Sequence, residues 1–301
     1  MNVAGRSIGI MTVNGFDFHP NARFREEAKQ RGHRVMLINP YSLCCSVGRN
    51  KGEVSFSDHD TLPDLVMPRQ GSPMGEYGFV LLRQFELMGI PLVNGIRGVT
   101  IARNQFMSLQ QLSGSGVPVP EACFVNRRDT FFEGVIRLGG YPVVVKQVDG
   151  MGGDGVEKLD SSSDAEGYLE DHFVPVKGLV LQRYIPPENR QDLRLLVVGD
   201  RVAGAMALTP PPGQFKANIH QQGRACAFSP SPELERTAVD AAKACSLDIA
   251  GVDIMVSPDA GAQVIEVNYS PGFSGLEKAT GKNIAATILE HVLKTAFRNQ
   301  S

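Results

Sequence analysis

One stretch near the carboxyl end constrains the fold more than any other part of the chain. Two β-rich runs, Gly251–Val256 and Ala262–Asn268, flank a Ser-Pro-Asp-Ala-Gly segment that is typical of a turn. The pattern predicts a β-hairpin in which Asp259 and Ala260 are the two central turn residues. The length of this turn matters, because a slip of one residue moves every side chain to the opposite face.

Oxygen-bearing side chains follow one face of the expected hairpin. Counting back from a two-residue turn places Asp253 opposite Glu266, with Asn268 two residues further along the same face. Cross-strand Cβ atoms lie about 4.5 to 5.5 Å apart, and like charges so placed destabilise a sheet unless something neutralises them. A divalent cation is the obvious neutraliser, and oxygen ligands without Cys or His suit Mg²⁺ or Mn²⁺ better than zinc. The other face is apolar and suited to burial, with Val252, Ile254, Ile265 and Val267.

The competing interpretation is an ordinary hairpin whose acidic face is merely solvated. We favour it less because Asn268-Tyr-Ser-Pro-Gly272 follows at once. A strand that ends in an Asn and a Ser-Pro-Gly turn leaves its last polar group at the lip of the sheet, where ligands bind.

Charge and cysteine usage exclude several classes of protein. The net charge is −2 and the pI is near 6.3, so neither nucleic acid nor an anionic membrane is an expected partner. The first residues lack the apolar core of a signal peptide, and no run approaches the roughly 18 apolar residues of a membrane span. The five cysteines show no Cys-x-x-Cys spacing, and no two of the six histidines are spaced i, i+4. We therefore expect a cytoplasmic protein with reduced cysteines and no histidine metal site.

The first ninety residues alternate between strand and helix patterns, which predicts an α/β domain with a parallel sheet. Arg69 ends one of the strands. Its charge is either solvated or paired locally, or it meets a ligand at the carboxyl end of the sheet, and the sequence leaves both interpretations open. The expected elements are strands at 7–13, 34–38 and 64–69, helices at 20–31 and 76–88, and a further single helix at 101–112.

The second half of the chain begins with a lysine beside a glycine-rich loop. A buried strand at 141–148 contains Lys146, the loop 149–155 follows, and the strand resumes at 156–159. Glycine amides approach phosphate oxygens closely, and a lysine just before the loop can reach the same oxygens. By itself this is a weak signal. Further on, the sequence predicts strands at 179–185, 192–198 and 201–208, a helix from Pro232 capped by Ser231, and a final amphipathic helix.

Taken together, these segments resemble the ATP-grasp ligases, and most closely the RimK family of amino-acid ligases that add glutamate to a protein C-terminus or a small acceptor. The resemblance covers nearly the whole chain, and the order and spacing of its motifs are highly specific. The motifs are Leu82-Arg-Gln-Phe-Glu86, Val143-Val-Val-Lys146, the Gly150 to Gly155 loop, Asp192-Leu-Arg-Leu-Leu-Val-Val-Gly-Asp200, Phe215-Lys-Ala-Asn218-Ile-His220, Ala250-Gly-Val-Asp253-Ile254, Glu266-Val-Asn268, Ser270-Pro-Gly272 and Glu277-Lys-Ala-Thr-Gly281.

The resemblance implies an α/β (α+β) chain with the ATP-grasp fold and an N-terminal α/β pre-ATP-grasp domain. It divides the sequence into a pre-ATP-grasp domain at 1–96, a central ATP-grasp subdomain with the glycine-rich loop at 97–177, and a C-terminal subdomain with the metal site at 178–301. It also implies a homo-oligomer.

The resemblance further implies a role for each motif residue. It assigns two Mg²⁺ or Mn²⁺ ions to Asp253, Glu266 and Asn268, and the ATP phosphates to Lys146, Gly152, Gly153 and Gly155. It places Asp192 at the nucleotide sugar, and Tyr184 and Ile185 at the adenine through their main chain, with Arg183 beside them. It places Lys216 and Asn218 near the phosphates, and Arg194 near the transferred phosphate or the substrate.

Two positions depart from the family pattern. Arg103-Asn104-Gln105 stands where the family usually has Arg-Asp-Lys, so a cation that normally meets ATP phosphate is absent. Gln182-Arg183-Tyr184 stands where Gln-Glu-Tyr is usual, so a donor-only side chain replaces an acceptor. Either departure could weaken ATP binding or change the choice of nucleotide.

By this resemblance the protein is an ATP-dependent carboxylate–amine ligase that joins a carboxyl group, activated as an acyl phosphate, to an amino acid, with L-glutamate favoured by analogy. Its partners are then ATP, the amino acid and a carboxyl-bearing protein or small acceptor. Two alternatives stay open: an ATP-grasp ligase for another amino acid in a biosynthetic pathway, and a degenerate member that binds nucleotide as a regulatory subunit.

Overall fold

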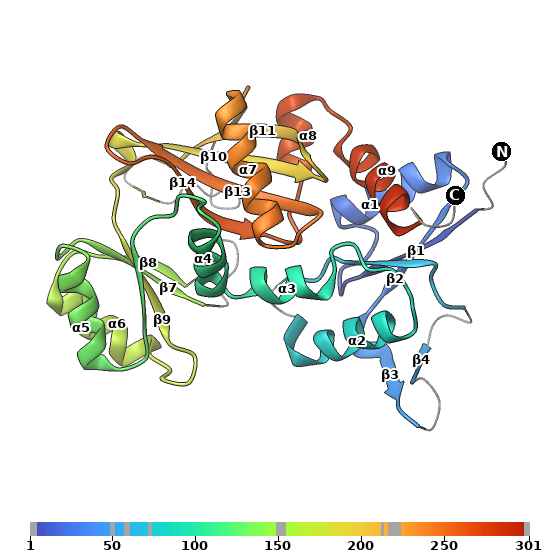
Figure 1. Ribbon diagram of the computed structural model, residues 1–301, viewed down its shortest axis with the longest axis horizontal. Coiled ribbons are helices and arrows are strands. Elements are labelled where there is room, and N and C mark those ends of the chain that lie inside the picture. The colour runs from blue at the N-terminus through green and yellow to red at the C-terminus, as the bar shows by residue number, and fades with distance from the viewer. Residues whose placement is uncertain are drawn as a thin grey trace.

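The amino-terminal part of the chain forms a parallel sheet, as the alternating pattern predicts. The computed structural model describes residues 5–48, 52–56, 61–71, 74–148, 155–211, 214–215 and 224–297. The three strands have the order β2-β1-β5 and all run parallel, so their carboxyl ends meet at one edge (Figure 1). The elements of this part are β1 (Ser7–Met11), α1 (His19–Gln30), β2 (Arg34–Ile38), a 3₁₀ turn (Pro40–Ser42), β3 (Leu43–Ser46), β4 (Glu53–Phe56), β5 (Leu65–Pro68) and α2 (Gly75–Leu87).

The predicted single helix at 101–112 is wrong, because the chain forms two helices that break at Asn104. α3 spans Ile96–Arg103 and α4 spans Gln105–Gly114. Asn104 leaves the helical region with φ −104° and ψ 118°, and its side-chain oxygen accepts a hydrogen bond from the amide of Met107 at 3.0 Å. A side chain that can cap a helix competes with continuation of the preceding one.

A four-stranded antiparallel sheet forms a separate lobe with its own apolar core, seen at the lower left of Figure 1. Its strand order is β6-β9-β7-β8, and the core side chains come from the strands and from two helices that cover one face. The elements are β6 (Ala122–Val125), α5 (Arg128–Arg137), β7 (Val143–Gln147), β8 (Val156–Leu159), α6 (Ser162–His172) and β9 (Leu179–Arg183).

The remaining strands form a five-stranded antiparallel sheet with the order β12-β11-β10-β13-β14. Ser231 caps α7 by accepting from the amide of Leu234, as predicted, and α9 buries Ile284, Ile288 and Val292 at helical spacing. The elements are a 3₁₀ turn (Pro187–Asn189), β10 (Gln191–Val198), β11 (Arg201–Thr209), β12 (Arg224–Ala227), α7 (Pro232–Ala244), β13 (Ile249–Ser257), β14 (Gly261–Asn268), α8 (Ser274–Thr280) and α9 (Ile284–Ala296). No helix in the described ranges is long and apolar enough to cross a membrane.

The predicted hairpin exists, but its two-residue turn is wrong. Ser257 pairs with Gly261, so the turn has three residues, and Gly261 adopts φ +67° to close it. A β-bulge then shifts the register by one, because Ile254 pairs with Val264 while Asp253 pairs with Glu266, which leaves Ile265 as the extra residue. The longer turn and the bulge cancel each other, so the predicted pairing of the two carboxylates is confirmed.

A buried asparagine joins the amino-terminal part of the chain to the five-stranded sheet. Asn94 is 2 % exposed, and its side-chain amide donates to the carbonyls of Ile249 (2.7 Å) and Tyr269 (2.8 Å). Its oxygen accepts from the amides of Asp248 and Ile249, both at 2.8 Å. One side chain therefore satisfies four main-chain groups at the junction between the first sheet and the hairpin.

We expect Asn94→Ala to lower the free energy of unfolding by at least about 3 kcal/mol, because it leaves several buried main-chain groups without partners. Urea unfolding followed by circular dichroism measures the loss. Asn126→Ala, the same change at an exposed position, is the matched control and should lie within about 0.5 kcal/mol of the wild type. A small effect at Asn94 would show that water replaces the amide at this junction.

Candidate functional site

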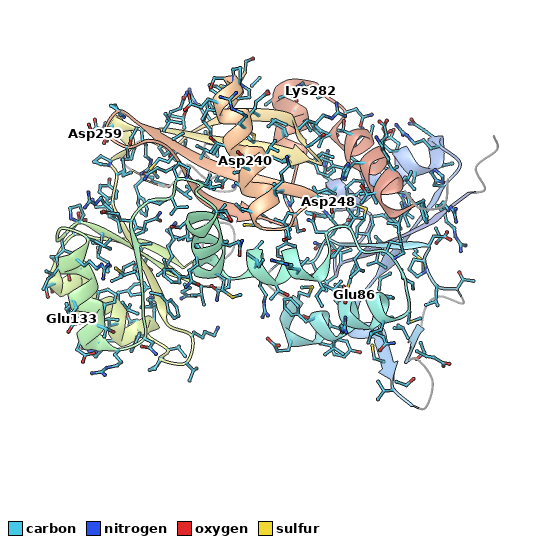
Figure 2. All side chains as sticks on the ribbon, viewed as in Figure 1. Glu86, Glu133, Asp240, Asp248, Asp259 and Lys282 are labelled. Atoms are coloured by element: carbon cyan, nitrogen blue, oxygen red, sulfur yellow. The ribbon has the colours of Figure 1, made fainter. Side chains whose placement is uncertain are left out.

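Strand register places three charged side chains in one row across the five-stranded sheet. Arg194 of β10 lies opposite Asp253 of β13, which lies opposite Glu266 of β14. Asn268 follows two residues after Glu266 on the same face. The row crosses the middle of the hairpin. Figure 2 labels the two ends of the hairpin, with Asp248 just before β13 at one end and Asp259 in the turn at the other.

Arg194 holds Asp253 in a bidentate ion pair. Its Nε lies 2.6 Å from Oδ1 of Asp253 and its Nη2 lies 2.5 Å from Oδ2. The carboxylate raises the pKa of Arg194 above its ordinary value, against the lowering effect of burial. An arginine therefore neutralises one member of the carboxylate pair, so crowding of the two charges does not by itself demand a metal ion.

Lys146 brings a second cation to the row from the other sheet. It lies on β7, is 7 % exposed, and burial lowers its pKa to about 8, while Glu266 and Asp253 act in the opposite direction. Desolvation by the surrounding protein raises the pKa of Glu266, as does the charge of Asp253, while Arg194 and Lys146 lower it; because Glu266 is exposed to solvent by accessible surface, we expect the desolvation effect to be modest. Two carboxylates and two cations from two sheets thus lie close enough to interact electrostatically, as expected of a site that balances phosphate and metal charge.

The donor set at this cleft fits a hard divalent cation. Two carboxylates and one amide oxygen are available from Asp253, Glu266 and Asn268, although the oxygen of Asn268 also accepts from the amide of Ser270 at 2.8 Å. Among the described residues, no group of three or more His, Cys, Asp or Glu side chains could hold a metal ion. A site here therefore needs further oxygen atoms from water or from a substrate.

The strand expected at the adenine presents a buried glutamine with an unused donor. Gln182 pairs with Val144, so it shares a face with Lys146, and it is 5 % exposed. Its Nε2 is buried and has no hydrogen-bond partner within the described ranges. Such an orphaned donor suits a ligand with acceptor atoms, as a purine has.

Arg183, the departure from the family pattern, lies on the opposite face of that strand. It pairs with Val143 in the lobe, and its Nη2 lies 2.6 Å from Oε2 of Glu121, where both side chains are more than half exposed. The arginine thus has a surface partner of its own. Next to it, the ring of Tyr184 lies 5.0 Å from Nζ of Lys158.

Arg190 was not predicted from the sequence, and it binds two residues that were predicted to contact the nucleotide, Asp192 and Ile185. Its Nε lies 2.9 Å and its Nη2 3.2 Å from the carboxylate of Asp192, and it also donates to the carbonyls of Ile185 and Phe215. Burial raises the pKa of Asp192, while Arg190 works against that shift. Arg190 has an extended backbone just before β10, so its spacing of two residues from Asp192 is a signal that could have identified the pair.

Gln105, the other departure, connects the two sheets. Its main-chain N–H donates to the carbonyl of Val148 at 3.2 Å. Its side-chain Nε2 lies 3.4 Å from the carbonyl of Ile265, the bulge residue of β14. Gln105 thus contacts the segment after β7 through its main chain and the hairpin through its neutral side chain. Four predicted site residues lie outside the described residues: Gly152, Gly153, Lys216 and Asn218. Gly155 adopts φ +70° and accepts from the amide of Gln147.

A cleft of about 280 Å³ extends from the hairpin to the carboxyl edge of the parallel sheet. Glu266 and Asn268 line it on one side, and Arg69 and Gln70, which follow β5, line it on the other. The carboxyl end of β5 therefore faces a cleft, as the ligand-binding interpretation of Arg69 requires.

Two antiparallel sheets that enclose a lysine and a carboxylate row define the ATP-grasp class, and solved structures share this fold. The RimK domain ATP-grasp protein of Sphaerobacter thermophilus aligns with 95 % of this chain at a TM-score of 0.74 and 21 % identity. The ATP-grasp ligase PsnB, in complex with minimal precursor, Mg and ADP, aligns with 98 % at 0.72 and 20 %.

Similarity of the amino-acid sequence to known families identifies the particular family within this class. Residues 7–99 match the RimK PreATP-grasp domain and residues 102–292 match the RimK-like ATP-grasp domain. A probable alpha-L-glutamate ligase 1 of Shewanella amazonensis is 36 % identical over 286 residues, 94 % of each chain, and a probable alpha-L-glutamate ligase of Marinomonas sp. is 37 % identical over 277 residues, 91 % of each. The chain belongs to the RimK family, and as a member it is an ADP-forming ATP-grasp ligase.

Proposed function

We propose that this protein activates a carboxyl group with ATP and joins it to the amino group of L-glutamate. The observation that supports the proposal most directly is the convergence of Lys146 with Arg194, Asp253 and Glu266 from two different sheets. Such a cluster offsets charge on a transferring phosphoryl group and needs no protein nucleophile. The choice of glutamate follows the names of the similar ligases.

The proposed reaction has two steps. A carboxylate oxygen of the acceptor attacks the γ-phosphorus of ATP, the bond to the β,γ-bridging oxygen breaks, and ADP leaves. The amino group then attacks the carbonyl carbon of the acyl phosphate, loses a proton and expels inorganic phosphate. Because the first step forms an acyl phosphate, the leaving group of the second step is phosphate instead of oxide, which is a very poor leaving group.

Each charged group of the site has a proposed role in the first step. Lys146 contacts the ATP phosphates, and Arg194 stabilises the charge on the transferred group. Asp253, Glu266 and Asn268 would hold Mg²⁺ or Mn²⁺, which supplies positive charge at the phosphate oxygens when it is bound. Asp192, held by Arg190, orients the nucleotide sugar. Lys216, Asn218 and the loop glycines complete the phosphate contacts in this proposal.

The acceptor in this proposal is the C-terminal carboxyl group of a protein or a small carboxyl-bearing molecule. Hydroxylamine tests the chemistry without the second substrate, because it converts an acyl phosphate to a hydroxamate. We expect hydroxamate and ADP to appear together, in equal amounts, with Mg²⁺, ATP and one member of a panel of carboxyl donors. ADP release that no donor stimulates, together with an absence of hydroxamate, would contradict a ligase that works through an acyl phosphate.

A further inference from the structure

A buried arginine on the floor of the cleft has no carboxylate partner among the described residues. Arg69 is 7 % exposed, follows β5 and lines the cleft beside Gln70. Its Nη2 donates to the carbonyl of Pro271 at 2.7 Å, but its Nη1 is buried and has no hydrogen-bond partner in the part of the chain that the structure describes. The local ion pair that the sequence left open for this residue is therefore absent from the described part of the chain.

The surroundings of Arg69 make its charge costly. The guanidinium carbon lies 5.6 Å from the ring centre of Phe24 and 6.0 Å from that of Phe273, which is the outer limit for a cation–π contact and replaces no counterion. Burial lowers the pKa of Arg69 to about 10, and only the hydroxyl of Tyr269 acts against that shift. An unpaired buried charge is strongly destabilising, whereas one hydrogen bond to Pro271 could come from a neutral side chain.

The position of Arg69 indicates what would pair with it. Its cleft also contains Asn268 and Glu266, so a group bound at Arg69 lies next to the proposed reaction centre. The guanidinium presents a planar fork that matches a carboxylate. The cleft volume, about 280 Å³, is at the lower end for small-molecule sites, which favours a free amino acid over a folded acceptor.

We propose that Arg69 binds a free carboxylate of the amino-acid substrate and thereby directs its amino group toward the activated carbonyl. This inference rests on the proposed ligase function and deepens it. Arg69 would then be a substrate-binding residue of the amino-terminal domain, while Lys146 and the hairpin handle the nucleotide. The acceptor also carries a carboxylate, so the test must separate the two sources.

The variant Arg69→Met removes the charge and keeps an apolar side chain of similar length against Phe24 and Phe273. We expect the affinity for L-glutamate, measured by calorimetry in the presence of Mg²⁺ and ADP, to fall about 30-fold or more. The KM for the acceptor in the hydroxamate assay should not change, since hydroxylamine replaces the amino acid. The melting temperature should equal or exceed that of the wild type, because replacing a buried charge with an apolar group removes its desolvation cost.

Substrate analogues identify the carboxylate that Arg69 contacts. L-Glutamine and L-isoglutamine each lack one carboxylate, and the wild type should bind one of them as weakly as Arg69→Met binds glutamate. Arg69→Met should bind that analogue no more weakly than it binds glutamate. Arg83→Met, at an arginine that is 58 % exposed on α2, controls for loss of one positive charge.

Three results would overturn the inference. The first is no binding of L-glutamate by the wild type, or equal binding by both proteins. The second is a raised KM for the acceptor in the hydroxamate assay with glutamate affinity unchanged, which would assign the carboxylate to the acceptor. The third is a lower melting temperature with equal losses for glutamate and ADP, the signature of a structural arginine. Hydroxamate formation reports the ligase chemistry separately, so failure of that chemistry is distinct from each of these.

Discussion

We expect Asp253→Asn to lower the turnover for hydroxamate formation and for ligation about 100- to 1000-fold. This is the largest effect we expect from any single change, because Asp253 lies at the centre of the charged row. The substitution removes one negative oxygen from the proposed metal site and one acceptor from the bidentate pair with Arg194. Arg194 can then turn to Glu266 and occupy the second carboxylate as well. Losses of this size follow removal of one preorganised electrostatic contact in other enzymes.

The matched control is Asp259→Asn, the same substitution at the exposed tip of the same hairpin (Figure 2). It should retain full turnover. Both variants need a cooperative thermal transition and measurable ADP binding for the comparison to hold. Full turnover in Asp253→Asn would show that the row is not the reaction centre. A wild type that binds ATP tightly but has no turnover to lose would favour the degenerate, nucleotide-binding alternative.

The face of the hairpin could be predicted from the sequence, whereas its turn could not. Alternation indicates which residues of one strand share a face, and it correctly placed Glu266 and Asn268 together. Turn length depends on backbone conformation at single residues, here the positive φ of Gly261, and a bulge leaves no mark in the alternation. The predicted pairing was right because one unseen change cancelled the other.

Contacts between distant segments account for most of what the sequence did not reveal. The ion pair of Arg194 with Asp253 joins residues 59 positions apart, and the hydrogen bonds of Asn94 span more than 150 positions. No local pattern reports such partners. Arg69 illustrates the same limit: its place at the end of a strand was predictable, but its contacts with aromatic rings depend on α1 and on the segment before α8.

Lys146 should take up a proton when nucleotide binds in alkaline solution. Its pKa of about 8 in the free protein means that a large part of the lysine is neutral at pH 8.5. Phosphate oxygens favour the ammonium form, so binding raises this pKa and draws in roughly 0.7 proton at pH 8.5, but almost none at pH 6.5, where the lysine is already charged. The affinity for ADP therefore falls as the pH rises through about 8.

Calorimetry with Mg²⁺ and ADP in buffers of different ionisation enthalpy measures this proton uptake as the slope of the observed enthalpy. We expect Lys146→Met to remove the slope at pH 8.5 and to weaken ADP binding roughly 10- to 150-fold at pH 7, the range for a hydrogen bond to a charged group. Lys243→Met, at an exposed lysine of α7, should keep both the slope and the affinity. A slope that persists in Lys146→Met would assign the proton to another group, and the lowered pKa of Lys146 would then result from its burial without any role in binding phosphate.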